Sequence, residues 1–149
     1  PGGKFDDEDV TLKQTALREC HEEIGVASHH IEIIGQLSQV VSLHSIRVTP
    51  FVGLIDEDVS FSPNPDELDS IFKVPTSFFN DAVPKRRDKM TYRDIALSVP
   101  SYDYQYEGEM YEIWGLSAIV LVELMNIAFD TAITIFDELP PSSVKNIET

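Results

Sequence analysis

The chain has 149 residues, 42% of them hydrophobic and 25% charged, which suits one folded domain and excludes a disordered or low-complexity chain. Its net charge of −15 argues against generic nucleic-acid binding, and a phosphate-rich ligand would need a cation between itself and the protein. Cys20 is the only cysteine, which excludes an intrachain disulfide and a cysteine-based zinc site and fits a reducing intracellular compartment.

The first predicted element is a helix that follows a loop containing Gly2 and Gly3. Thr11 is a suitable N-cap, "LKQTALRECHEEI" continues the helix over residues 12–24, and Gly25 is well placed to end it. These signals predict a helix whose two ends are both marked in the sequence.

Strands are predicted in the next part of the chain. Residues 30–42 and 46–55 are rich in β-branched residues that alternate in part with polar ones, so we expect two strands joined by a turn at Leu43 and His44. Residues 56–68 contain many turn formers and are predicted to form a loop.

The second half of the chain continues this mixed pattern. We expect a strand over residues 69–75, a helical turn over 76–81, a polar loop or hairpin over 82–95 and a partly strand-like aromatic segment over 100–115. A helix should follow within residues 113–136. This order of elements predicts an α+β or mixed α/β fold.

The apolar stretch over residues 113–136 is long enough to suggest a membrane span, but Glu123, Asn126 and Asp130 interrupt it. A central acid costs about 2.5–3.5 kcal/mol on membrane-insertion scales. We therefore expect a buried helix of a soluble domain, with no membrane partner.

The segment "RECHEEIG" places three acids on the first helix. At about 100° per residue, Glu19, Glu22 and Glu23 fall within an arc of about 100° and share one face. The adjoining face is predicted to pack against a sheet and consists of Ala16, Leu17, Cys20 and Ile24. Carboxylates beside Arg18 and a glycine turn suit Mg²⁺ or Mn²⁺. A solvated acidic face is the alternative.

Three other groups of side chains could take part in binding, and each has a simpler interpretation. The histidines are more typical of exposed positions than of a metal site, and they are His21, His29, His30 and His44. Three cations could meet a phosphate or lie in a solvated loop, namely Lys85, Arg86 and Arg87. The aromatic set could stack a base or pack internally, and it comprises Tyr102, Tyr104, Tyr106, Tyr111 and Trp114.

The segment "GGKFDDEDVTLKQTALRECHEEIGV" resembles the Nudix box, in which a glycine, five residues, a glutamate and seven residues precede R-E-U-x-E-E-x-G-U, U being a bulky apolar residue. The matching positions are Gly3, Arg18, Glu19, Cys20, Glu22, Glu23, Gly25 and Val26. Asp9 stands in place of the first glutamate, with eight residues before Arg18. This variant, with "TPFVGLID", "PNPDEL", "FKVP" and "IWGLSA", resembles the coenzyme A diphosphatase branch, especially its animal peroxisomal members.

The resemblance implies an α/β/α sandwich around a mixed sheet, formed by one Nudix domain over residues 1–149. Strands and a coenzyme A signature normally precede the glycine pair, so we expect this chain to lack them and to expose an edge and an apolar face of the sheet. The C-terminal residues carry no peroxisomal signal, which leaves the cytosol and the mitochondrion as alternatives to the peroxisome.

The resemblance also implies a reaction and a site. Mg²⁺ or Mn²⁺ would be held by Glu19, Glu22, Glu23 and the carbonyl of Gly3, while Arg18 would orient the glutamates. The substrate would be a small molecule, coenzyme A or its acyl esters, cleaved to 3′,5′-ADP and 4′-phosphopantetheine. Glu19 would be a ligand or the general base, and other candidates for the base are Glu107, Glu109 and Glu112.

Two alternatives to this function stay open. One is a Nudix hydrolase for another nucleoside diphosphate derivative, such as ADP-ribose or an oxidised nucleotide. The other is a truncated and catalytically silent binding module.

Overall fold

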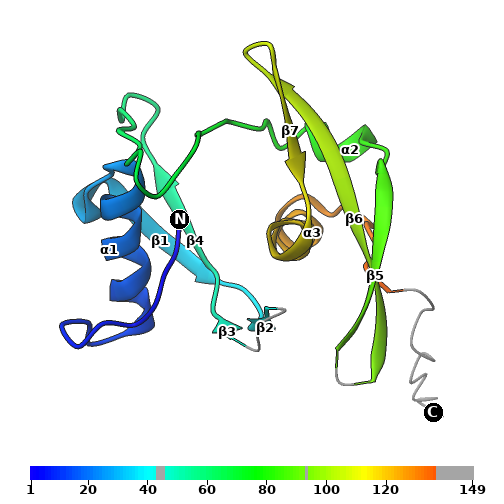
Figure 1. Ribbon diagram of the computed structural model, residues 1–149, viewed down its shortest axis with the longest axis horizontal. Coiled ribbons are helices and arrows are strands. Elements are labelled where there is room, and N and C mark those ends of the chain that lie inside the picture. The colour runs from blue at the N-terminus through cyan, green and yellow to red at the C-terminus, as the bar shows by residue number, and fades with distance from the viewer. Residues whose placement is uncertain (43–45, 93, 137–149) are drawn as a thin grey trace, which may run out of the picture. The chain divides into compact units, whose positions relative to one another are not determined.

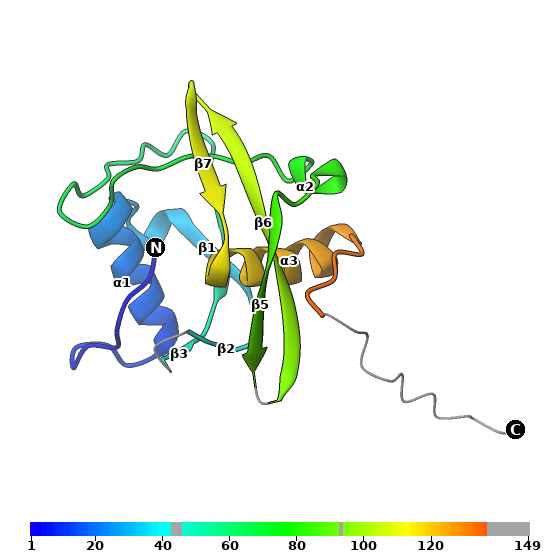
Figure 2. The same cartoon turned by 45° about the vertical axis from the view of Figure 1, so that its right-hand side comes forward.

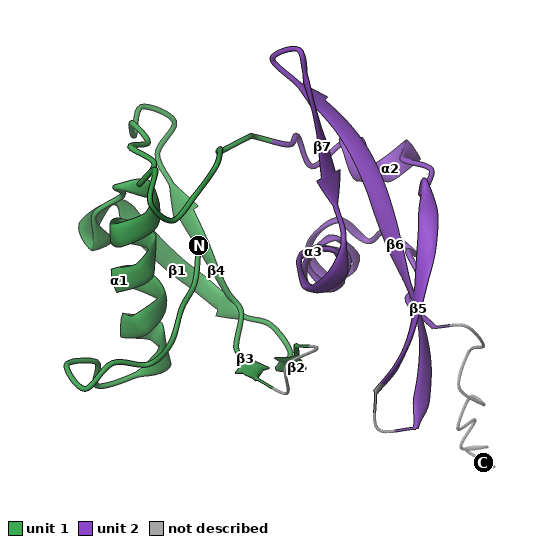
Figure 3. Cartoon of the chain, in the orientation of Figure 1, with its two compact units in different colours: residues 1–73 green, residues 74–149 purple. Residues whose placement is uncertain are grey.

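The computed structural model describes residues 1–42, 46–92 and 94–136. The chain divides into two compact units, residues 1–73 and residues 74–149 (Figure 3). Each unit combines helices with antiparallel strands, so the predicted α+β class is confirmed.

Helix α1 (Leu12–Ile24) is the main helix of the first unit (Figure 1). It begins with a capping box, in which the Thr11 side chain accepts from the backbone of Gln14 and the Gln14 side chain accepts from the backbone of Thr11. It ends at Gly25, whose φ of 74° is left-handed. Both predicted ends of the helix are confirmed, and the 3₁₀ helix η1 (Ser28–His30) follows.

The two strands predicted for the first unit are each divided in two. Strand β1 (Ile31–Gln36) pairs antiparallel with β4 (Phe51–Ile55), and β2 (Val40–Val41) pairs antiparallel with β3 (Arg47–Val48). Pro50 has no N–H group, and the β1–β4 register shifts between Ile33 and Gly35. Pro50 lies between β3 and β4, so its missing N–H accounts for the break there, whereas the register shift lies inside β1 and does not end that strand. The turn predicted at Leu43 and His44 lies outside the described residues.

Residues 56–75 contain a confirmed loop and one wrong prediction. Residues 56–68 form neither helix nor strand, as predicted. Residues 69–75 also form no strand, so the strand predicted there is wrong. A segment of strand-like composition forms a strand only where a neighbouring strand completes the hydrogen-bond ladder. This segment instead joins the first unit, which ends at Lys73, to the second.

The second unit contains a three-stranded antiparallel sheet in the order β5-β6-β7 (Figure 2). Its strands are β5 (Arg86–Tyr92), β6 (Ile95–Tyr106) and β7 (Glu109–Ile113), and the short helix α2 (Phe78–Asp81) precedes them. The helical turn over 76–81, the hairpin alternative for 82–95 and the strand-like segment over 100–115 are therefore confirmed.

The core of the second unit lies on β6, where residues 98–102 are all buried. Phe78 and Phe79 meet the ring of Tyr102 edge to face. Helix α3 (Gly115–Phe129) lies against β6 (Figures 1 and 2). Beyond α3 the chain returns to the same strand, where the N–H of Ser98 donates to the carbonyl of Ile135 at 2.7 Å.

Helix α3 is shorter than the predicted range and is buried along one stripe only. Its buried residues are Ala118, Val122 and Met125, at the spacing of one helix face, whereas Ile127 is 69% exposed. Among the described helices, none has the length and apolar character needed to cross a membrane.

The packing of α3 can be tested with Met125→Ala and its control Ile127→Ala. Met125 is 1% exposed, so its truncation should leave a cavity and lower the free energy of unfolding by about 2–5 kcal/mol in urea denaturation. Ile127→Ala should change it by no more than about 0.5 kcal/mol, because its side chain is mostly in solvent. Equal losses in the two variants would contradict this packing.

Candidate active site

The guanidinium of Arg18 gathers the acidic residues of the first unit around one point. Its Nε and Nη2 donate to the carboxylate of Asp9 at 3.2 and 3.0 Å, and Nη2 also donates to the carbonyl of Lys4 at 2.9 Å. Nη1 donates to Glu19 at 2.8 Å and to Glu22 at 2.9 Å. A guanidinium has five N–H donors, so all of them are used.

Asp9 anchors this arrangement from the loop before the helix. Besides Arg18, it accepts from the hydroxyl of Thr15 at 2.9 Å and from the N–H of Asp6 at 3.0 Å, and its side chain is only 5% exposed. The hydrogen bonds from Arg18, followed by that from Asp6, lower the pKa of Asp9 from 3.8 to about 2. Asp9 is therefore a structural acid that holds Arg18.

Asp9 is a residue of the site that was not predicted from the sequence. The available signal was its place at the position of the first glutamate of the Nudix box, displaced by one residue. Its function as an anchor could not be derived from that position, because it depends on a loop that brings Asp9 back to Arg18, nine residues further along the chain.

The two glycines of the N-terminal loop run along the same face of α1. A Cβ at Gly3 would lie 2.2 Å from Oε1 of Glu19, so only glycine lets the backbone pass so close to that carboxylate. The N–H of Gly2 donates to Glu23 at 3.2 Å. The predicted residues Gly3, Arg18, Glu19 and Glu22 thus meet directly, and Glu23 lies beside the neighbouring glycine.

The glutamates differ in their exposure to solvent. The side chains of Glu19 and Glu23 are each 14% exposed, whereas that of Glu22 is 47% exposed. Acids on a solvated helix face would all be exposed, so this pattern favours a built site over the solvated alternative. We call the surface formed by Glu19, Glu22 and Glu23 the glutamate face.

The glutamate face was compared with the requirements of a divalent cation. Within the described residues, no three His, Cys, Asp or Glu side chains are grouped closely enough to hold a metal ion. However, one oxygen of Glu19 and one of Glu22 each lie within 2.9 Å of the same cationic nitrogen of Arg18. The carboxylates therefore already converge on a positive charge, and carboxylate oxygens are the donors that Mg²⁺ and Mn²⁺ prefer. The chemistry of these donors therefore suits such an ion, and in this structure the guanidinium of Arg18 occupies the point on which they converge.

The three predicted cations of the second unit have partners within that unit. Lys85 pairs with Asp103 at 3.0 Å, and Arg87 donates to the carbonyls of Ser98 and Thr134 at 3.0 and 2.9 Å. Arg86 pairs with two acids of the same sheet, Asp88 on β5 and Glu112 on β7. These contacts favour a structural role in the sheet over phosphate binding.

The later acids were considered as candidates for the general base. Glu112 accepts from the hydroxyl of Ser101 at 2.6 Å, and this hydrogen bond, followed by that from Arg86, lowers its pKa. A carboxylate with a lowered pKa is a weaker proton acceptor, which makes Glu112 a less suitable base. Glu107 and Glu109 flank the turn between β6 and β7 and are exposed.

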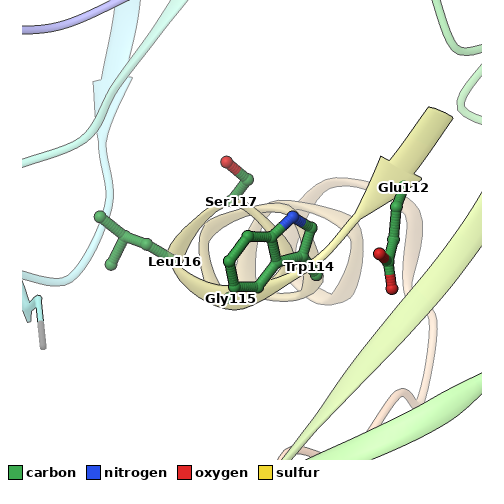
Figure 4. A pocket seen from close by; sticks show the side chains of 5 residues that line it. All are labelled: Glu112, Trp114, Gly115, Leu116 and Ser117. Atoms are coloured by element: carbon green, nitrogen blue, oxygen red, sulfur yellow. The ribbon is translucent and has the colours of Figure 1, made fainter.

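Two members of the aromatic set take part in packing. Tyr102 and Tyr104 both contact the ring of Phe78. Trp114 is instead 55% exposed and lines an open pocket of about 270 Å³ at the start of α3 (Figure 4). Among the described residues that line this pocket, Glu112 alone is ionisable, so they do not include grouped acids like those of the glutamate face.

The described histidines are exposed. His21 lies on α1, and the rings of His29 and His30 are 4.0 Å apart in η1. His44 lies outside the described residues. These positions favour the simpler interpretation of the histidines over a metal site.

Comparison with known proteins gave a family and several relatives. The family model of the NUDIX domain matches residues 1–90. The chain is 28% identical over 142 residues to "Nudix hydrolase 15, mitochondrial" of Arabidopsis thaliana, which covers 94% of this chain and 50% of the relative. It is 33% identical over 127 residues to "Uncharacterized Nudix hydrolase NudL" of Yersinia enterocolitica, covering 83% and 62%. The corresponding protein of Photorhabdus laumondii is 34% identical over 125 residues, covering 83% and 64%. The chain thus spans between half and two thirds of these relatives.

The anchor role of Asp9 predicts a pH-dependent effect of Asp9→Asn. Because the folded pKa of about 2 lies below the ordinary value of 3.8, the ionised carboxylate stabilises the fold fully above that value. This stabilisation is lost as the pH falls through 2. Urea denaturation should therefore show a deficit for Asp9→Asn that is largest above pH 4 and shrinks toward pH 2. Asp58→Asn, in an exposed turn, is the control, and a deficit independent of pH would contradict the assignment.

Proposed function

Because the chain belongs to the NUDIX domain family, we propose that it takes part in the hydrolysis of a diphosphate bond in a small nucleotide-like substrate, with Mg²⁺ or Mn²⁺ as cofactor. The observation that carries this proposal is the convergence of Glu19 and Glu22 on Arg18 beside Gly3. The relatives are named as Nudix hydrolases, which supports the reaction class.

The glutamate face would hold the cation through Glu19, Glu22 and Glu23, with the carbonyl of Gly3 as a further oxygen donor. When bound, the cation neutralises the diphosphate, orients it and lowers the pKa of water. Arg18 and Asp9 would keep the carboxylates in place, because a guanidinium held at all five donors cannot easily turn away. Glu19 is both close to Gly3 and mostly buried, so it is suited to binding the ion or to accepting the proton of the attacking water.

The charge of the protein supports the need for a cation. The chain carries 26 acids against 11 Lys and Arg residues, and the predicted phosphate-binding cations of the second unit are engaged by partners of their own. A diphosphate approaching the glutamate face would be repelled unless positive charge were added there. A divalent ion supplies that charge at the position of the reacting bond.

We further propose coenzyme A and its acyl esters as substrates, yielding 3′,5′-ADP and (acyl-)4′-phosphopantetheine. The support is the one-residue extension of the Nudix box and the segments "PNPDEL", "FKVP" and "IWGLSA". ADP-ribose and oxidised nucleotides are the alternative substrates. A peroxisomal location is proposed from the same resemblance, and the mitochondrial Arabidopsis relative supports a mitochondrial location as the alternative.

We also propose that residues 1–149 belong to one Nudix domain. The family match over residues 1–90 supports this, because it extends beyond Lys73 into the second unit. A catalytically silent module would instead keep this fold without turnover. The assay below separates these possibilities.

The test is hydrolysis by the full-length protein of coenzyme A, ADP-ribose and nucleoside triphosphates with Mg²⁺ or Mn²⁺, followed by chromatography of the products. We expect 3′,5′-ADP from coenzyme A. Glu23→Gln should lower turnover by more than about 100-fold, because changes to groups that merely support metal ligands already cost about 10–100-fold. Its thermal melt should match that of the unchanged protein.

The matched control is Glu57→Gln, the same chemical change on an exposed loop, which should leave turnover unchanged. Full activity of Glu23→Gln would contradict the site. Faster hydrolysis of ADP-ribose than of coenzyme A would overturn the substrate, and no hydrolysis of any of these compounds would support the silent module.

A further inference from the structure

The C-terminal turn of α1 receives hydrogen bonds from a segment far along the chain. The carbonyl of Glu23 accepts from the N–H of Asn64 at 2.8 Å, and the carbonyl of Ile24 accepts from the N–H of Ser62 at 2.8 Å. The last four carbonyls of a helix have no partner within it. Residues 62–64 therefore satisfy two of those carbonyls in α1. One of the two is the carbonyl of Glu23, whose side chain is part of the glutamate face.

The segment that makes these bonds is a turn with internal support. The side-chain oxygen of Asn64 accepts from the N–H of Asp66 at 3.1 Å, and its backbone carbonyl accepts from Glu67 and Leu68 at 3.1 and 2.9 Å. An asparagine that hydrogen-bonds the backbone two residues later is a common way to fix a turn. The prolines on either side, Pro63 and Pro65, restrict the backbone further.

Gly25 allows this turn to approach the helix. Its φ of 74° is accessible to glycine at little cost, and a Cβ at this position would lie 2.8 Å from the Cβ of Ser62. A larger residue would both strain the helix end and push the turn away. The glycine of "RECHEEIG" is thus required by the neighbouring turn as well as by the end of the helix.

We propose that Asn64 is a positioning residue for the glutamate face, an inference that rests on the proposed function. Glu23 is held at two points, its carboxylate by the N–H of Gly2 at 3.2 Å and its carbonyl by the N–H of Asn64. The turn over residues 62–68 fixes the end of α1, and with it the direction in which Glu22 and Glu23 leave the helix. Loosening the turn should weaken binding of a divalent cation without removing any ligand.

The test compares Asn64→Ala, Asn64→Ser and Asn64→Asp in the full-length protein, with Asn80→Ala on the exposed surface of α2 as the matched control. Two quantities are measured. Hydrogen–deuterium exchange without metal reports on the amides of residues 21–25 and 62–64, and a titration followed by electron paramagnetic resonance gives the Kd for Mn²⁺.

For Asn64→Ala we expect faster exchange in both segments and a Kd for Mn²⁺ raised by about tenfold, the size of effect seen when a supporting group is lost. Asn64→Asp keeps the turn-forming oxygen and should match the unchanged protein, while Asn64→Ser should fall between, because a hydroxyl makes the same turn more weakly. The control should change neither quantity.

Unchanged exchange and Mn²⁺ affinity in Asn64→Ala would overturn the positioning role, and so would an Asn64→Asp variant as impaired as Asn64→Ala. If Asn64→Ala does not fold, the exchange rates and Mn²⁺ affinities of Asn64→Ser and Asn64→Asp decide. A Ser variant no more impaired than the Asp variant would then overturn the positioning role. Failure of the proposed function is distinguishable, because it would appear as absent hydrolysis in the unchanged protein. The exchange rates would still support or overturn the role of Asn64 in that case.

Discussion

The guanidinium of Arg18 is the interaction on which the candidate site depends. It donates five hydrogen bonds, to a loop carbonyl, to Asp9 and to two glutamates of its own helix. Arginine is suited to this role because its planar fork remains charged and can bind several oxygens in fixed directions. The loop before α1 and the acids on α1 are therefore fixed to each other by one side chain.

This constraint explains how an acidic chain can concentrate further acids in one place. Like charges at neighbouring helix positions are unfavourable, and partial burial of Glu19 and Glu23 strengthens their repulsion. Arg18 offsets that repulsion in the structure, and the capping box and Gly25 hold the helix that carries it. The carboxylates of Glu19 and Glu22 are thereby held in a fixed orientation, which is what partners around a metal site supply to its ligands.

The local features of the site could be predicted from the sequence, whereas its contacts between residues far apart along the chain could not. The helix and its ends follow from Thr11 and Gly25, and the shared face of Glu19, Glu22 and Glu23 follows from the helical period. The position of Asp9 against Arg18 depends on how the intervening loop folds, and no periodicity describes that. The turn formers of residues 62–68 predicted a loop, but the sequence did not show that its backbone N–H groups donate to the end of α1.

The strands show the same limit on what can be predicted from the sequence. Composition predicted one strand over residues 30–42 and one over 46–55, and each is divided in two, the second at Pro50, which has no N–H to donate to a ladder. Residues 69–75 have a strand-like composition and cross the boundary at Lys73 from the first unit to the second, and they form no strand. Propensity describes a residue's fitness for a sheet, whereas the neighbouring strand decides whether a ladder forms.

The central claim, that Glu19, Glu22 and Glu23 form a cation site rather than a solvated acidic surface, is tested most directly by NMR with traces of Mn²⁺. The paramagnetic ion broadens the signals of carboxylate carbons near which it binds. With 26 acids in the chain, the account predicts that residues 19–23 and the amide of Gly3 broaden first, at Mn²⁺ concentrations that leave the other acids sharp. Uniform broadening over the acidic residues, or broadening first at another group of acids, would contradict it.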